Sequence, residues 1–177
     1  MRQKAFILIS AVLLFTAVLQ GQCPLGNLWA RLVYLRESKN LSPDMKLKTL
    51  LSILDSLSHF NNKDDSTYSF LLARIGKTYY DQGDFITAVR YYHQSIDVLI
   101  RNAGKPSVNL THLPARYYYL ALCFAALNSV GEKMEAFDSC LTVSTRLDYV
   151  DRSSLVAVQT WVEYFFDVGD YQRCIDY

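Results

Sequence analysis

Residues 72–95 read LARIGKTYYDQGDFITAVRYYHQS. On both sides of Gly83, apolar side chains recur every three to four residues, which is the spacing of one face of an α-helix. Asp84 follows the glycine, and its carboxylate can accept hydrogen bonds from the free amides of a helix start. The segment therefore predicts two antiparallel helices joined by a tight turn.

The rest of the chain follows the same helical period. Its 177 residues include only 7 glycines and 4 prolines, a composition that favours long helices over a turn-rich β fold. Seven helices are expected, with apolar stripes over residues 28–35, 47–57 (opened by Ser42 and Pro43), 71–79, 89–99, 120–127, 137–147 and 158–165. With 18 basic and 17 acidic residues and no long run of either sign, the chain has no charge pattern for binding nucleic acid.

The first 22 residues have the pattern of a signal peptide. Arg2 and Lys4 precede an apolar run over residues 5–19, which is shorter than a membrane-spanning helix requires. Cys23 is a poor lipidation site because Gln22 before it is not small. We therefore predict an exported protein on the periplasmic or extracytoplasmic side of a bacterial inner membrane, with no direct membrane binding by the mature chain.

The spacing within residues 72–95 resembles a tetratricopeptide (TPR) repeat. The residues that carry the resemblance are Leu72, Ile75, Gly76, Tyr79, Gly83, Phe85, Ala88, Tyr92 and Ser95. In that family a glycine of the first helix faces an alanine of the second, because small side chains let the helices approach closely. The resemblance implies that Gly76 faces Ala88.

Two further units repeat this spacing less completely. The second has Leu120, Cys123, Leu127, Gly131 and Ala136, with Phe124 at the place of Gly76; the third has Val158, Trp161, Phe165, Gly169 and Tyr171. We expect an all-α fold of antiparallel hairpins stacked as a short right-handed TPR-like solenoid. Residues 23–65 would form a degenerate N-terminal hairpin with Asn40 at its turn, and residues 66–177 the TPR-like repeats, about two complete and the third truncated.

The sequence has no common catalytic or metal-binding motif. The sequence lacks a phosphate-binding Gly-Lys-Ser/Thr loop, a Gly-x-Ser-x-Gly elbow, His-Glu-x-x-His and Cys-x-x-Cys. Cys123 and Cys140 fall almost level if the second hairpin turns at Gly131, so a disulfide is open, but two free thiols in a helix interface are favoured. We therefore predict no enzyme activity, no cofactor and no metal.

The remaining candidate site is the concave wall, which the resemblance places on the first helix of each unit. The predicted partner-binding residues are Phe70, Lys77, Tyr80, Tyr118, Asn128, Gln159, Glu163 and Phe166. Aromatic side chains in such a groove suit peptide capture, although each could instead pack against the neighbouring repeat. Family members that hold a partner's terminal carboxylate pair Lys or Arg with Asn, and Lys77 with Asn128 does not complete that pattern.

Two functions follow from the resemblance. The first is a non-enzymatic module of an exported bacterial TPR protein that binds a protein or peptide partner in its groove. The alternative is the N-terminal sensory region of a membrane-bound signalling protein, either a histidine kinase or a transcriptional regulator, because the long repeat units are similar to those of such proteins. The apolar third unit also predicts self-association through the C-terminal end.

Overall fold

The computed structural model describes residue 35 and residues 41–59 and 66–176, and every regular element in those ranges is helical. They contain α3 (Pro43–His59), α4 (Ser66–Asp81), α5 (Phe85–Arg101), the 3₁₀ turn η1 (Leu110–His112), α6 (Leu113–Ala126), α7 (Val130–Arg146), α8 (Arg152–Asp167) and α9 (Tyr171–Asp176). The predicted all-α fold is confirmed. The expected signal peptide, almost all of the first expected helix and the turn at Asn40 lie outside the described residues.

The chain divides into two compact units, residues 1–53 and 54–177, and the helices from α4 onward belong to the second. Helix α3 begins as predicted. Ser42 Oγ accepts a hydrogen bond from Met45 N at 3.3 Å, and Pro43 takes the first helical position, where a missing N–H costs nothing.

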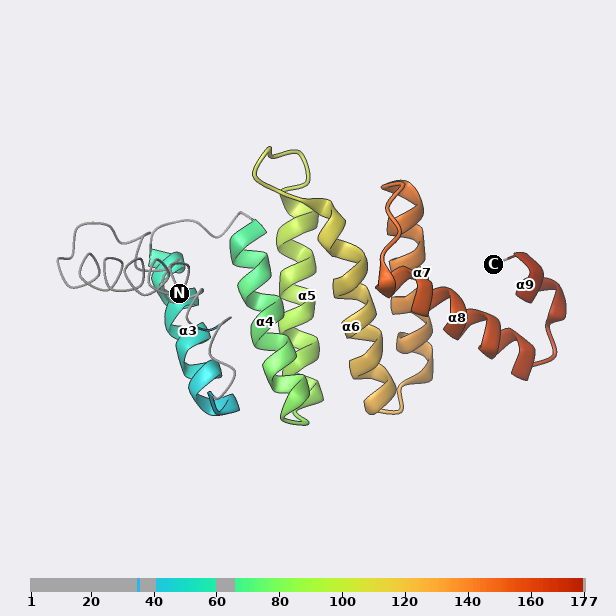
Figure 1. Ribbon diagram of the computed structural model, residues 1–177, viewed down its shortest axis with the longest axis horizontal. Helices are drawn as coiled ribbons and strands as arrows, with labels where there is room; N and C mark the ends of the chain where they lie inside the picture. The colour runs from blue at the N-terminus through green and yellow to red at the C-terminus, as the bar shows by residue number, and fades with distance from the viewer. Residues whose placement is uncertain (1–34, 36–40, 60–65, 177) are drawn as a thin grey trace, which may run out of the picture. The chain divides into compact units, whose positions relative to one another are not determined.

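Helices α4 and α5 form the predicted hairpin and lie side by side in Figure 1. Gly83 turns the chain with a φ of 83°, and Asp84 Oδ1 accepts from Thr87 N at 3.1 Å. A Cβ atom added to Gly76 would lie 3.3 Å from Ala88 O and 3.3 Å from Tyr91 Cβ. The predicted close approach of Gly76 and Ala88 is therefore confirmed, since any larger side chain would have to displace helix α5.

A pair of buried serines also joins α4 to α5. Ser69 Oγ donates to Ser95 O at 2.9 Å, and Ser95 Oγ donates to Ser69 O at 2.8 Å. Each hydroxyl therefore bonds to the backbone of the facing helix, which satisfies two polar groups inside an apolar interface.

The second hairpin turns at Asn128, and the predicted turn at Gly131 is wrong. Asn128 has a φ of 57°, whereas Gly131 lies in the first turn of α7. Asparagine is one of the few residues that adopt the left-handed conformation at modest cost, so it replaces glycine here.

The three first helices end with the same backbone hydrogen bonds, which fixes how the units correspond. Each helix is followed by a residue with a positive φ: Gly83, Asn128 or Gly169. The next residue donates its backbone N–H to the carbonyl of an aromatic residue in the helix: Asp84 N to Tyr79 O (3.0 Å), Ser129 N to Phe124 O (2.9 Å) and Asp170 N to Phe165 O (2.8 Å). In this register Ala121, fully buried, takes the place of Gly76. The second unit therefore keeps a small residue where the helices meet, and Phe124 does not depart from the pattern.

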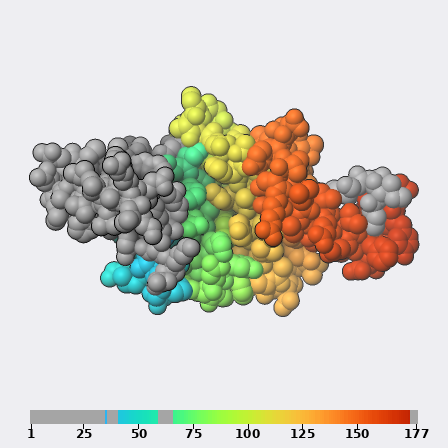
Figure 2. Space-filling view, in the orientation of Figure 1, coloured from blue at the N-terminus to red at the C-terminus, as the bar shows by residue number. Residues whose placement is uncertain are grey.

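One apolar core runs through the stacked helices. Helix α5 packs on α6, α6 on α7, and α8 on both α6 and α7. The core cluster includes Ala88, Tyr92, Leu99, Leu120, Ala121, Cys123, Phe137, Cys140 and Ala157. Helix α9 packs on α8, and in Figure 2 these two helices extend beyond the body formed by α4–α7.

Candidate functional site

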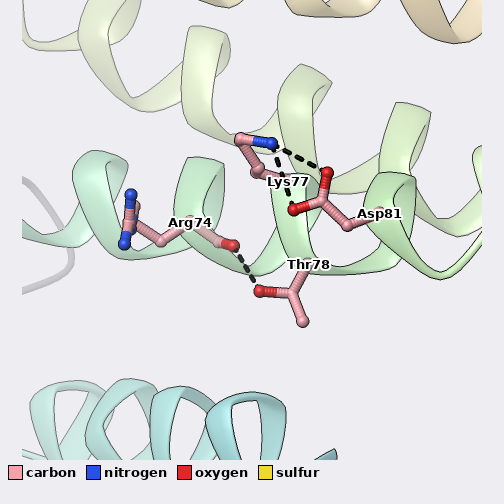
Figure 3. Close-up of polar contacts among 4 residues, drawn as sticks. All are labelled: Arg74, Lys77, Thr78 and Asp81. Atoms are coloured by element: carbon pink, nitrogen blue, oxygen red, sulfur yellow. Dashed lines mark hydrogen bonds and ion pairs between the residues drawn. The ribbon is translucent and has the colours of Figure 1, made fainter. Parts of the chain in front are cut away.

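Helix α4 carries three of the predicted partner-binding residues. Phe70 is 43% exposed, with the guanidinium carbon of Arg74 6.0 Å from its ring centroid. Lys77 is half-buried and forms an ion pair with Asp81 at 2.8 Å. Figure 3 shows Lys77 and Asp81 together on one side of α4, with Thr78 pointing away from them and donating to Arg74 O at 2.9 Å.

Tyr80 contributes mainly to packing within its own hairpin. It is half-buried against the core cluster, and its ring meets Phe85 of α5 edge-on at 5.4 Å. Each aromatic residue was expected either to contact a partner or to pack within the repeats. Most of the Tyr80 ring is used for packing.

The second unit places its two predicted residues differently from the expectation. Tyr118 is half-buried on α6, with its ring 6.3 Å from Phe137 of α7 and 5.3 Å from Tyr119. Asn128 is exposed in the turn after α6 and does not lie on a first helix as predicted. The turn was predicted at Gly131, three residues after its place at Asn128, so the expected alignment of α6 with α4 was shifted by three residues. Neither Tyr118 nor Asn128 therefore corresponds to the α4 residue with which it was aligned.

Helix α8 carries the last three predicted residues. Gln159 and Glu163 are exposed one helical turn apart, and Gln159 Nε2 donates to Glu163 Oε1 at 2.8 Å. Phe166 is 62% exposed and meets Tyr171 of α9 edge-on at 5.6 Å. These side chains are therefore available to a partner, as is Phe70 on α4.

Three residues of the first helices that matter here were not predicted from the sequence: Arg74, Arg116 and Tyr119. In the register set by the turns, Tyr119 of α6 is the counterpart of Arg74 of α4. Lys77 Nζ lies 5.8 Å from the Tyr119 ring centroid, and Tyr119 stacks on Tyr92 of α5 at 5.7 Å. Arg74 could have been found from the sequence, because it follows Phe70 by one helical turn.

Burial dominates the electrostatics of this junction between α4, α5 and α6. It lowers the pKa of Arg116 below its usual range, and nearby Arg74 acts in the same direction. It also raises the pKa of the Tyr92 hydroxyl well above its usual value, with Cys123 and Tyr119 adding to the effect. The Tyr92 hydroxyl therefore stays protonated around neutral pH.

Cys123 and Cys140 are free and fully buried, as favoured from the sequence. With the turn at Asn128, Cys140 lies much further along the chain from the turn than Cys123, so the two are not level. Burial raises the pKa of each thiol to about 12. Because the thiolate is the reactive form, neither side chain is suited to nucleophilic chemistry.

No group of three or more His, Cys, Asp or Glu residues in the part of the chain that the structure describes is arranged to hold a metal ion. None of the helices seen there is both long and apolar enough to cross a bilayer.

No family model matches the sequence, and no curated protein matches it. The solved structures that resemble the chain include the following two. BtubC (BKLC) from P. vanneervenii has a TM-score of 0.59 and 9% identity over 72% of this chain and 49% of its own, so this chain spans about half of BtubC. A variant of a proposed kinesin light chain from P. anserina, with nearly identical TPR-like repeats, has a TM-score of 0.61 and 12% identity over 98% of this chain and 84% of its own. The chain therefore has the fold of TPR-like repeat proteins.

Proposed function

We propose that the chain is a non-enzymatic interaction module that holds a segment of a partner protein against its first helices, α4, α6 and α8. One observation carries the proposal: packing leaves aromatic and charged side chains of α4 and α8 exposed to solvent. Phe70, Gln159, Glu163 and Phe166 are the predicted residues concerned.

The character of these side chains favours a protein partner. An exposed phenylalanine that is not used by the core adds contact area with few rotatable bonds to freeze. The neighbouring polar residues give direction to the contact through hydrogen bonds. A TPR-like stack sets neighbouring first helices side by side, so an extended segment could contact more than one of them.

We also propose an exported bacterial setting, which rests on the pattern of residues 1–22. The test is expression of the full chain in a bacterium, followed by fractionation and N-terminal sequencing. A periplasmic product that begins near residue 22 supports export. A cytoplasmic product that retains Arg2 and Lys4 contradicts it.

Selection of random peptides displayed on phage tests the binding proposal. Peptides that bind the folded chain should lose affinity for the Phe166→Ala and Glu163→Ala variants. They should keep it for the Glu135→Ala variant, which changes an exposed acid on the second helix α7. Failure to enrich any peptide, or equal loss in all three variants, would contradict binding on the first helices.

Self-association through α8 and α9 is a separate proposal. Around the turn from α8 to α9, three large apolar side chains are more than half exposed: Phe166, Val168 and Tyr171. Clustered exposed apolar residues commonly form interfaces. Sedimentation should show a dimer that dissociates in the Phe166→Ser/Tyr171→Ser variant, whereas an unchanged monomer at high concentration would contradict the proposal.

A further inference from the structure

The junction of α4 and α6 gathers the cationic side chains of Lys77, Arg74 and Arg116, and Lys77 lies over the ring of Tyr119. Lys77 Nζ lies 5.8 Å from the Tyr119 ring centroid. Arg116 lies on α6, about one helical turn before Tyr119. Arg74 is near enough to Arg116 to act on its charge. Asp81 is the acid on this side of α4, and Lys77 binds both of its carboxylate oxygens, at 2.8 and 3.1 Å.

Among the described residues, Arg116 has no acidic partner at this junction. Its Nε atom is buried and has no hydrogen-bond acceptor in that part of the chain, and no carboxylate there is among the groups that influence its charge. An arginine stays protonated in proteins, so a partly buried guanidinium without an anion is costly to the fold. An anionic group supplied from outside would reduce that cost.

The Tyr92 hydroxyl is a second polar group there that lacks a partner within residues 41–59 and 66–176. The side chain is only 1% exposed, and its oxygen has no hydrogen-bond partner in these ranges. Its ring stacks on Tyr119 at 5.7 Å, which links the orphaned hydroxyl to the same junction. Two unsatisfied polar groups from neighbouring helices are unusual in one small region, because most buried polar atoms are paired.

We infer that Arg74, Arg116 and Tyr119 form a subsite for acidic side chains of the partner segment. This inference rests on the proposed function and specifies the chemistry of the partner. A glutamate or aspartate side chain pairs with Arg74 and Arg116, and the adjoining part of the segment packs on the Tyr119 ring. The subsite recognises internal acidic side chains, so it does not require the free chain terminus and asparagine of a terminal-carboxylate site.

The charges on the neighbouring first helix favour an acidic peptide over nucleic acid. Helix α8 presents Glu163 and Asp167, both exposed. A continuous phosphate backbone that left the α4–α6 junction along the first helices would meet these carboxylates. A peptide can place its acidic residues at the arginines alone and uncharged residues beyond them.

The test starts with random peptides displayed on phage and selected on the full chain. The enriched peptides should be rich in Asp and Glu. A fluorescent copy of one of them should bind about tenfold less tightly to Arg74→Gln and to Arg116→Gln. The matched control is Arg90→Gln, which removes an exposed arginine from the second helix α5 and should change the dissociation constant by less than about twofold.

Each outcome bears on the inference. Enriched peptides without acidic residues, still sensitive to Phe166→Ala, would overturn the subsite and leave the proposed function standing. Absence of any enriched peptide would overturn both. Arg74-dependent binding of a single-stranded DNA oligonucleotide would also overturn an acidic peptide as the occupant. Arg74 is exposed, so its variant keeps the test valid if Arg116→Gln reduces folding.

Discussion

The α4–α5 and α6–α7 hairpins reach the same backbone geometry with different residues. The first uses Gly83 at its turn, and the second uses Asn128, each with a positive φ. Asp84 also caps α5 with its side chain, whereas Ser129 makes no side-chain cap bond to α7. The comparison teaches that the backbone hydrogen bonds define the repeat, and that the sequence marks the second turn less strongly than the first.

Enlarging the small residue at the helix contact should have the largest effect. Gly76→Leu should reduce the free energy of unfolding by about 1 to 3 kcal/mol, because its Cβ already meets backbone and side-chain atoms at 3.3 Å. Ala121→Leu should do the same in the second hairpin. Urea denaturation measures both, with Lys77→Ala as a control at a half-buried surface position, where the loss of an i,i+4 ion pair should change stability by less than about 0.5 kcal/mol. Equal midpoints for Gly76→Leu and Lys77→Ala would disprove the close contact.

Exchanging one hydroxyl between the hairpins should give effects of opposite sign. Tyr92 and Phe137 lie the same distance after the N-caps Asp84 and Ser129, and both are buried. Tyr92→Phe removes an unpaired hydroxyl and should raise stability by up to about 1 kcal/mol, while Phe137→Tyr should lower it by about 1 to 3 kcal/mol. Thermal denaturation of the two variants checks the signs. A loss of stability in Tyr92→Phe would mean that the hydroxyl has a partner in solution.

The two turns should differ in their response to substitution. Gly83→Ala should cost about 1 kcal/mol, because alanine is strained at a φ of 83°. Asn128→Gly should change stability by less than about 0.5 kcal/mol, since glycine also adopts this conformation. Chemical denaturation of both variants tests the difference. A cost for Asn128→Gly equal to that of Gly83→Ala would show that the asparagine side chain has a role of its own.

The smallest effect near neutral pH concerns the two thiols, which both belong to the second hairpin. Their folded pKa of about 12 lies above the ordinary value of 9.0, so the folded state holds these protons more tightly than the unfolded state. The stabilisation is complete below pH 9 and is lost as the pH rises towards 12. Cys123→Ala/Cys140→Ala should therefore lose less stability between about pH 8 and pH 10 than the unaltered chain. If the variant and the unaltered chain lost the same stability over this pH range, the thiols would not be the cause of the loss.

The first hairpin could be predicted closely because its signals agree. Gly83, Asp84 and the apolar period all indicate the same turn, and the structure has it there. In the second hairpin Gly131 and Asn128 are both chemically suited to a turn. Glycine is the commoner choice at such a position, and only the backbone hydrogen bond from Ser129 N to Phe124 O decides for Asn128.

The error in the turn also limited the prediction of the candidate site. A shift of three residues along a helix changes the side of the helix that faces a given neighbour by about 60°. Tyr118 was therefore expected at the place of Phe70, which Ala115 holds in the register set by the turns, and Asn128 was expected on a helix that ends at Ala126. The missing partners of Arg116 and Tyr92 depend on contacts between three helices, which a single sequence does not display.

The serine pair of α4 and α5 has a mechanical consequence. If either helix slid along the other by one turn, both hydroxyls would leave their carbonyls at 2.9 and 2.8 Å and become stranded in an apolar interface. The cost of two stranded groups makes sliding an all-or-none event instead of a gradual one. The hairpin therefore moves as one rigid unit. A force that a partner exerts on α4 is transmitted to α5 and on to α6, which packs on α5.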